Sequence, residues 1–274
     1  MEVPTRPERV KVNGKAWRSA TDKSVGIWVE DVVAVLNNAD YKAFQLGTIA
    51  FALKIYDALY VDRSLRRQGE IGFGRDPAVP NIVELLYRHG HISYPGLSIA
   101  YVAKLAPLYS LGSYRSEFCQ GDRTTVDAVG EREWMFDAMA AAFLDYQSAA
   151  HDFRIILSAG GGIRMPRHVL LSFINSNLIM AHRQQYNFFQ LNETRRNDDF
   201  KFFFRINPEY VIDSDLQSIG LPLFGGNSTT FIAEAVDPNP DNVEWVVGRM
   251  IFINYCVFLD YRQNQISFSK LKKQ

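Results

Sequence analysis

A regular spacing of apolar residues between Glu131 and Asn192 constrains this chain more than any other feature. In the first half of that stretch, apolar side chains recur at alternating intervals of three and four residues, as they do on one face of an α-helix. These residues are Phe136, Met139, Phe143, Tyr146, Ala150, Phe153 and Leu157. The spacing therefore predicts a long central helix with a buried face.

Similar patterns predict helices on both sides of the central one. After the triple glycine at 160–162, Pro166 stands where a first-turn proline would, and the apolar residues beyond it predict a helix towards Tyr186. Upstream, the apolar spacing and the glycine and proline stops predict helices over 41–67, 81–89 and 94–107. The segment 24–38 is predicted to be a short helix or a strand, and its apolar residues on one face favour the helix.

The chain beyond Asn197 has a different residue pattern. Its segments are rich in aromatic and β-branched residues and are separated by turn residues, which predicts strands. The last two strands are expected to form a hairpin around Arg262 and Gln263. We therefore expect an α+β protein with a predominantly helical body and a β-rich C-terminal part. The expected divisions are an extended N-terminal arm (1–22), a helical domain (23–197) and a β-rich part with a basic tail (198–274).

The cysteine content and the hydropathy pattern indicate a cytoplasmic protein. Cys119 and Cys256 are the only cysteines in 274 residues, so we expect neither a disulfide framework nor a zinc site. The first residues carry charges and prolines where a signal peptide would be apolar. No later window has the roughly 18 uninterrupted apolar residues of a membrane span. The expected location is therefore the cytoplasm, or a virion if the protein is viral, without membrane contact.

Charge is balanced overall but unevenly distributed. Lysines and arginines number 30, as do aspartates and glutamates, so no global field attracts nucleic acid. The stretch 151–197 nevertheless has six basic residues against two acidic ones. Arginines mixed with aromatic side chains are typical of single-stranded RNA binding. The candidate phosphate-binding and stacking residues are Arg164, Arg167, Arg183, Arg195, Arg196 and Tyr186.

The triple glycine supports an alternative hypothesis. Gly160–Gly162, followed by Arg164, Arg167 and His168, could form a phosphate cradle at the start of a helix, although a plain helix cap explains the glycines as well. We find no established catalytic or nucleotide-binding motif and no set of residues at metal-ligand spacing. The chain is therefore expected to be non-enzymatic and to need no cofactor.

The segment 245–268 resembles the last strands of pepsin-like aspartic proteases. The shared positions are Trp245, Gly248, Tyr255, Asp260, Asn264, Ile266 and Phe268. Those enzymes share a proton between two carboxylates in paired Asp-Thr/Ser-Gly loops. The nearest candidate here, Asp213-Ser214-Asp215, lacks the glycine and a second copy. Protease activity is therefore not expected.

A second resemblance concerns the layout of an arm, a helical body with a basic middle, and a terminal extension. This layout is similar to that of nucleocapsid and coat proteins of RNA viruses, and Leu97–Pro107 resembles a helix of segmented negative-strand virus nucleoproteins. The resemblance implies polymerisation and RNA binding in a basic groove. The leading hypothesis is thus a self-assembling, homo-oligomeric structural protein that packages single-stranded RNA. The alternatives are a phosphate- or nucleotide-binding enzyme and a protein-interaction module.

Overall fold

The structure is a computed structural model, and its chain divides into two compact units. One unit comprises Met1–Phe73 and Ala78–Ser93, and the other comprises Gly74–Pro77 and Tyr94–Gln274. We call them the N-terminal and C-terminal units. The structure describes residues 11–18, 25–36, 43–56, 72–77, 80–103, 106–114, 117–143, 146–148, 151–158, 162–177, 179–183, 188–191, 201–215, 230–236 and 239–272.

The described part of the N-terminal unit contains an antiparallel sheet and a short helix. Strands β1 (Lys11–Arg18), β2 (Val25–Leu36) and β3 (Ala43–Tyr56) pair in that order. The strand β1 lies within the segment that we expected to be an extended arm. The helix favoured over 24–38 is wrong, because β2 is the strand that the pattern also allowed. The helix expected over 41–67 is wrong in the part of that range that the structure describes, where β3 runs.

The short helix α1 (Ile82–Arg88) confirms the helix expected over 81–89. The Asn81 side chain accepts hydrogen bonds from the backbone N–H of Val83 and Glu84 at 2.9 and 3.2 Å, and the Glu84 carboxylate accepts from the Asn81 backbone at 3.1 Å. This reciprocal capping box satisfies donors that the first helical turn would leave unpaired. The helix is followed by Gly90, whose positive φ of 72° suits glycine.

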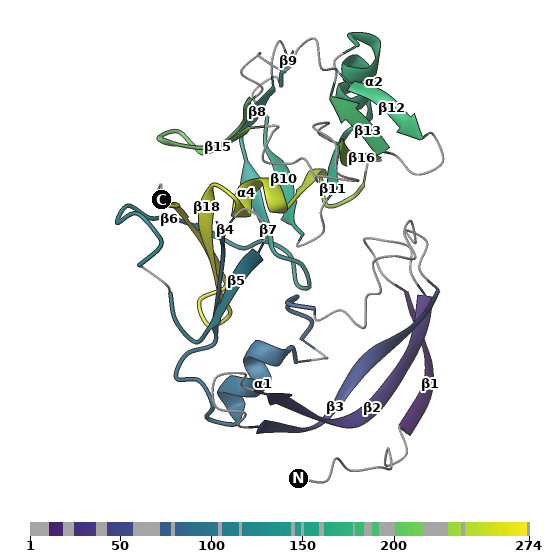
Figure 1. Cartoon of the computed structure of the whole chain (residues 1–274), viewed down its shortest axis with the longest axis vertical. Coiled ribbons are helices and arrows are strands. Elements are labelled where there is room, and N and C mark those ends of the chain that lie inside the picture. Colours follow the sequence, from purple (N-terminus) through teal and green to yellow (C-terminus); the bar gives the residue numbers. More distant parts are fainter. Residues whose placement is uncertain are drawn as a thin grey trace. The chain divides into compact units, whose positions relative to one another are not determined.

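Three sheets and two further helices make up the described part of the C-terminal unit (Figure 1). The first sheet has the order β12-β13-β16-β11-β17-β10-β7, the second β15-β14-β8-β9, and the third β5-β4-β18-β19-β6. The strands are β4 (Gly96–Ala103), β5 (Ala106–Leu111), β6 (Thr124–Asp127), β7 (Met135–Ala138), β8 (Ala140–Phe143), β9 (Tyr146–Gln147), β10 (Phe153–Leu157), β11 (Gly162–Pro166), β12 (Ile179–Arg183), β13 (Phe188–Leu191), β14 (Lys201–Asn207), β15 (Tyr210–Asp215), β16 (Thr230–Val236), β17 (Val243–Val247), β18 (Tyr255–Asp260) and β19 (Gln265–Lys270). The helices are α2 (Arg167–Asn175) and α4 (Arg249–Phe252).

The predominantly helical body predicted from the sequence is wrong, because strands dominate the described structure. The expected central helix is divided among four strands: Phe136 lies in β7, Phe143 in β8, Tyr146 in β9 and Phe153 in β10. The apolar spacing of three and four residues is therefore not helical, because its residues are divided among separate short strands. Ala141 on β8 is buried and pairs with Phe204 on β14, so tertiary packing overrides the helical preference of alanine.

The other predictions for this unit have mixed outcomes. Leu97–Pro107, expected to be helical, lies mainly in β4 and β5. The helix expected after Pro166 exists as α2, although Pro166 is its N-cap and the helix ends at Asn175, far short of Tyr186. The β-rich character expected beyond Asn197 is confirmed, as is the hairpin, in which β18 and β19 pair from Tyr255–Lys270 to Asp260–Gln265.

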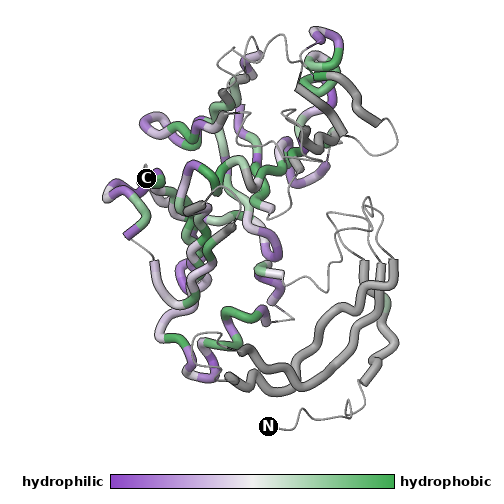
Figure 2. Tube along the Cα trace, in the orientation of Figure 1, coloured by the Kyte–Doolittle hydropathy of each residue, from purple (hydrophilic) through white to green (hydrophobic). Residues whose placement is uncertain are grey.

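Large aromatic side chains form the core of the C-terminal unit. Trp245 is 1% exposed and lies edge-on to the rings of Phe202 and Phe204, at centroid distances of 6.2 and 5.2 Å. Apolar residues follow the central strands, whereas hydrophilic residues gather in the turns (Figure 2). Among the helices in the described ranges, none is long and apolar enough to cross a membrane.

Candidate functional site

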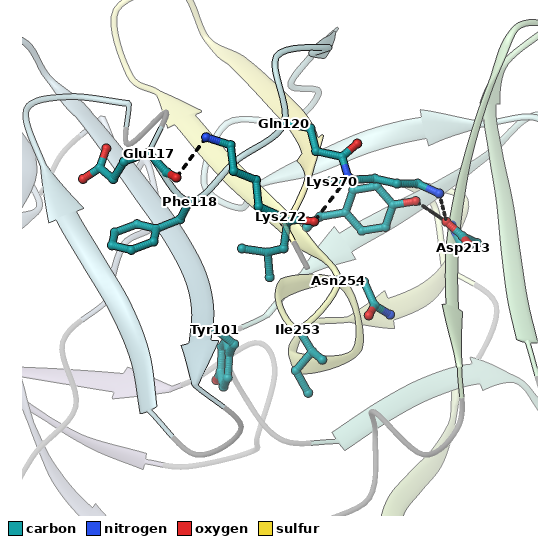
Figure 3. A pocket seen from close by; sticks show the side chains of 11 residues that line it. Tyr101, Glu117, Phe118, Gln120, Asp213, Ile253, Asn254, Lys270 and Lys272 are labelled. Carbon is teal, nitrogen blue, oxygen red and sulfur yellow. Dashed lines mark hydrogen bonds and ion pairs between the residues drawn. The ribbon is translucent and has the colours of Figure 1, made fainter. Parts of the chain in front are cut away.

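A pocket of about 580 Å³ opens on the C-terminal unit, where one end of the β18–β19 hairpin meets a segment that precedes β6 (Figure 3). We call it the Tyr255 pocket. Its lining combines aromatic and aliphatic side chains with amide and charged ones. The lining residues are Tyr101, Glu117, Phe118, Gln120, Asp213, Ile253, Asn254, Tyr255, Lys270, Leu271 and Lys272.

Backbone pairing brings the pocket walls together. The segment 117–120 lies against the end of β19, because the Gln120 N–H donates to the Lys270 carbonyl at 2.8 Å and the Lys272 N–H donates to Phe118 at 2.9 Å. On the other side, the Leu271 N–H donates to the Asn254 carbonyl at 2.9 Å. These bonds extend the five-stranded sheet beyond its regular strands. The pocket walls are therefore held by the sheet rather than by loop contacts alone.

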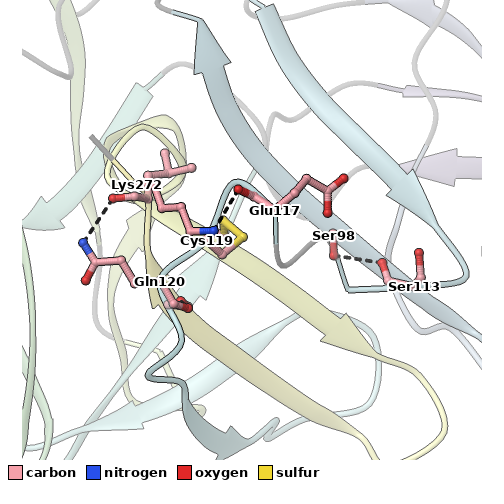
Figure 4. The surroundings of a disulfide bond; sticks show 9 residues. Ser98, Ser113, Glu117, Cys119, Gln120 and Lys272 are labelled. Atoms are coloured by element: carbon pink, nitrogen blue, oxygen red, sulfur yellow. Dashed lines mark hydrogen bonds between the residues drawn. A yellow bond between two sulfur atoms is a disulfide. The ribbon is translucent and has the colours of Figure 1, made fainter. Parts of the chain in front are cut away.

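A disulfide joins two of these walls, which corrects the expectation that the cysteines are unpaired (Figure 4). Cys119 and Cys256 are 3% and 1% exposed, and they pack with Ala100 and Leu271. Cys119 stands between pocket residues Phe118 and Gln120, and Cys256 directly follows Tyr255. The two cysteines are separated by 137 residues, and only the β-sheet pairing brings them together.

Three polar side chains form a network at one wall of the pocket. The Tyr255 hydroxyl donates to Asp213 Oδ1, and Lys270 Nζ lies 3.1 Å from the same oxygen. Burial favours a raised pKa of the Asp213 carboxyl, but the hydrogen bonds from Tyr255 and Lys270 outweigh burial and hold that pKa below its ordinary value. Burial, together with donation to Asp213, raises the pKa of Tyr255. The network therefore holds Asp213 as a carboxylate and Tyr255 as a neutral phenol.

The predicted RNA-binding residues are located elsewhere, and only some of them are described. Arg164 is partly buried in β11, where its backbone lies opposite that of Glu234 in β16, and Arg167 is exposed at the start of α2. The backbone of Arg183 ends β12, and two strands, β13 and β16, separate β12 from β11 in the sheet. Tyr186, Arg195 and Arg196 lie outside the described residues.

The surroundings of Arg164 contain acidic residues. Burial raises the pKa of the Glu133 carboxyl, nearby Asp241 raises it further, and the positive charge of Arg164 opposes this rise. Arg164 therefore lies within the electrostatic reach of a carboxyl group, in a setting of mixed charge rather than on a purely basic surface.

Gly162, the last residue of the triple glycine, does not lie at the N-terminus of a helix. Gly162 begins the five-residue strand β11, whose other four residues stand between Gly162 and α2. A strand of that length spans roughly 16 Å. Gly160 and Gly161 lie outside the described residues. The residue that caps α2 is Pro166, and it makes no side-chain hydrogen bond to the helix. The helix therefore does not begin at a glycine, as the expected phosphate cradle would require.

Sequence inspection missed the Tyr255 pocket almost completely. Lys270 and Lys272 were predicted only as parts of a basic tail, and Asp213 was considered only as a protease carboxylate. The pocket unites segments near residues 101, 118, 213, 254 and 271, and no local motif encodes that contact. Among the described residues, no group of three or more His, Cys, Asp or Glu side chains could hold a metal ion.

Comparison with known proteins adds no family: neither the scan against protein-family models nor the search of curated proteins finds a match for this chain.

Proposed function

We propose that this chain is a non-enzymatic binding protein whose C-terminal unit holds its ligand in the Tyr255 pocket. The observation that carries the proposal is the composition of that pocket, in which apolar side chains such as Phe118, Ile253 and Leu271 stand beside polar groups held by hydrogen bonds. Pockets of a few hundred Å³ with this mixture are typical sites for small ligands or short segments of a partner.

The network around Asp213 supports binding rather than hydrolysis. A carboxyl group that shares a proton in an aspartic dyad needs a partner carboxylate, which raises one of the two pKa values. Asp213 instead accepts hydrogen bonds from Tyr255 and Lys270, which lower its pKa. Asp213 is therefore poorly suited to act as the acid of such a dyad.

The buried disulfide supports an oxidising location. Structural disulfides persist in secreted and extracellular proteins and are rare in the cytosol. Because Cys119 and Cys256 form a disulfide in the structure, we infer that the protein works in an oxidising compartment rather than in the cytoplasm.

A thermal-shift screen tests the proposed function. Short peptides, saccharides, fatty acids and nucleotides are added to the wild-type chain, to Phe118→Ala and to the control Tyr109→Ala, which alters an exposed tyrosine of β5. We expect at least one class to raise the melting temperature of the wild type and the control, but not that of Phe118→Ala. Cleavage of the peptides, detected by mass spectrometry, or stabilisation that survives in Phe118→Ala would contradict the proposal.

Self-association is a second candidate, favoured by the outer face of the second sheet. Phe203 and Val211 are 39% and 37% exposed there, while the alternate residues Phe202, Phe204 and Ile212 are buried. Contiguous apolar patches on a protein surface mark protein contacts, and Phe203 and Val211 lie on paired strands of this face. Size-exclusion chromatography tests this candidate: the wild type should elute as an oligomer and Phe203→Ser as a smaller species. A monomeric wild type would exclude it.

RNA packaging stays a prediction, and the same chromatography tests it. The absorbance ratio at 260 and 280 nm of the eluting protein reports bound nucleic acid. A packaging protein should carry RNA that is released by salt and should lose it in Arg164→Ala and Arg167→Ala variants. A nucleic-acid-free protein at every salt concentration would exclude this role.

A further inference from the structure

Lys270 is a cation that is held in position but still accessible at the wall of the Tyr255 pocket. Its ammonium pairs with Asp213 at 3.1 Å and lies 6.0 Å from the centre of the Tyr255 ring, while 52% of the side chain remains exposed. An ammonium group has three hydrogen-bond donors. In the described part of the chain, Lys270 pairs with a single carboxylate, so it can donate to a ligand as well.

The formal charges of the lining residues balance, so the pocket has no positive excess that would attract a multiply charged anion. Lys270 and Lys272 contribute two positive charges, and Glu117 and Asp213 contribute two negative ones. A multiply charged anion such as a phosphate monoester would meet no net positive potential here. A lone carboxylate needs only one cation, which Lys270 supplies.

If the ion pair between Asp213 and Lys270 weakens, the Asp213 carboxylate still accepts a hydrogen bond from Tyr255. The Tyr255 hydroxyl donates to its carboxylate, and the Asp213 backbone N–H donates to the same hydroxyl at 3.1 Å. A ligand carboxylate would therefore compete with Asp213 for Lys270 while Tyr255 continues to stabilise Asp213. Removing the charge of Asp213 should consequently strengthen the binding of an anion.

The amide side chains of the pocket favour a peptide over other carboxylates. Asn254 Nδ2 donates to Ser214 Oγ at 3.2 Å, and Gln120 Nε2 donates to the Leu271 carbonyl at 3.4 Å. These bonds leave both side-chain oxygens as acceptors that, within the described residues, have no donor. Peptide N–H groups are donors that can satisfy them, whereas a fatty acid carries none.

We propose that the Tyr255 pocket binds the carboxyl terminus of a peptide with apolar terminal residues. In this arrangement, Lys270 pairs with the terminal carboxylate, Phe118 and Leu271 contact the apolar side chains, and Asn254 and Gln120 accept hydrogen bonds from the peptide backbone. Capture of a terminal carboxylate is a known mode of peptide recognition. The inference rests on the proposed function, because it names the ligand of the same pocket.

Calorimetric titration with matched ligands tests the inference. The probes are N-acetyl-Leu-Phe, its C-terminal amide, and octanoate as a carboxylate without N–H groups. We expect the free acid to bind the wild type at least about tenfold more tightly than the amide does, as one charge-assisted hydrogen bond would provide. Octanoate should bind more weakly than the peptide acid.

Three variants locate the effect. Lys270→Met should abolish the preference for the acid over the amide, and Arg262→Met, at the opposite end of the hairpin, should leave it unchanged. Asp213→Asn should increase the affinity for the acid several-fold, a gain that misfolding cannot produce. Near-ultraviolet circular dichroism of each variant checks its folding.

The outcomes separate this inference from the proposed function. Equal binding of acid and amide that is lost in Phe118→Ala would overturn the carboxylate inference but retain the pocket as a binding site. Tighter binding of octanoate than of the peptide acid would replace the peptide with a fatty acid. An undiminished acid preference in Lys270→Met, a weaker acid affinity in Asp213→Asn, or no binding of any probe would also overturn the inference.

Discussion

At the scale of single residues, the hydrogen bond that the Tyr255 hydroxyl donates to Asp213 changes the pKa of both groups. Asp213 has an ordinary pKa of 3.8 when unperturbed, and in the folded protein its pKa is lower. A carboxyl group with a lowered folded pKa contributes stability above its unfolded pKa and loses it as the pH falls through the folded value.

This linkage predicts loss of stability in acid. As the pH falls below about 4, the free energy of unfolding of the wild type should decrease, because the unfolded Asp213 binds a proton before the folded one does. The decrease should be smaller in Asp213→Asn. Urea unfolding at several pH values between 2 and 6 measures both curves, and parallel curves would contradict the assignment.

The raised pKa of Tyr255 predicts a loss of stability at alkaline pH. Its ordinary pKa is 10.0, and burial with donation to Asp213 raises the folded value. A phenol with a raised folded pKa contributes stability below its unfolded pKa and loses it as the pH rises. The unfolding free energy should therefore fall above pH 10, with a shallower slope in Tyr255→Phe. An identical slope in the variant would show that other tyrosines cause the change.

At the scale of elements, the turn of the β18–β19 hairpin is held by Asp260. One carboxylate oxygen accepts from the backbone N–H of Arg262 and Gln263 at 3.0 and 2.9 Å, and the other accepts from the Tyr94 hydroxyl at 2.7 Å. Asp260 is only 7% exposed, so its removal would leave partly buried donors without an acceptor.

Asp260→Ala should therefore lower the free energy of unfolding by about 1–3 kcal/mol. Guanidinium unfolding measures the loss, and Asp127→Ala, which alters an exposed carboxylate near the same turn, is the control. Asp260→Asn should recover part of the stability, because its amide oxygen still accepts hydrogen bonds. A loss in the control equal to that in Asp260→Ala would mean that the turn contacts are not responsible.

The elements also show which parts of the structure sequence patterns can predict. The strands β14, β17, β18 and β19 and the helix α1 were predictable, because their residue types and turn or capping residues are local signals. The helical pattern around Phe136 and Phe153 misled prediction, since a succession of strands shorter than six residues reproduced a helical spacing. Whether such a spacing belongs to a helix or to short strands becomes clear only from the strands with which the segment pairs.

At the scale of the whole molecule, the candidate site could not be predicted because it joins segments far apart in the sequence. Asp213 in β15 meets Lys270 at the end of β19 although the two residues lie 57 positions apart, and Cys119 meets Cys256 across 137 residues. Spacing within the sequence carries no signal for such contacts. The predicted RNA-binding arginines show the opposite case. Arg164 and Arg183 are close in sequence, but their strands are not neighbours in the sheet.

The disulfide should stabilise the chain strongly. A cross-link between residues this far apart restricts the unfolded chain, and loss of a native disulfide costs about 2–5 kcal/mol. The double variant Cys119→Ala/Cys256→Ala should therefore unfold at a lower denaturant concentration than the oxidised wild type. The reduced wild type should behave like the double variant. Titration of free thiols in the unfolded, non-reduced protein gives a direct control, and two reactive thiols would show that the disulfide is absent.

The most direct test of the account is to map ligand contacts by NMR chemical shifts while peptide, saccharide and oligonucleotide ligands are added to the labelled chain. A binding protein that uses the Tyr255 pocket should show its largest shifts at residues 117–120, 253–255 and 270–272 with one ligand class. Shifts that instead centre on Arg164 and Arg167 with oligonucleotides, and leave the pocket unchanged, would contradict it.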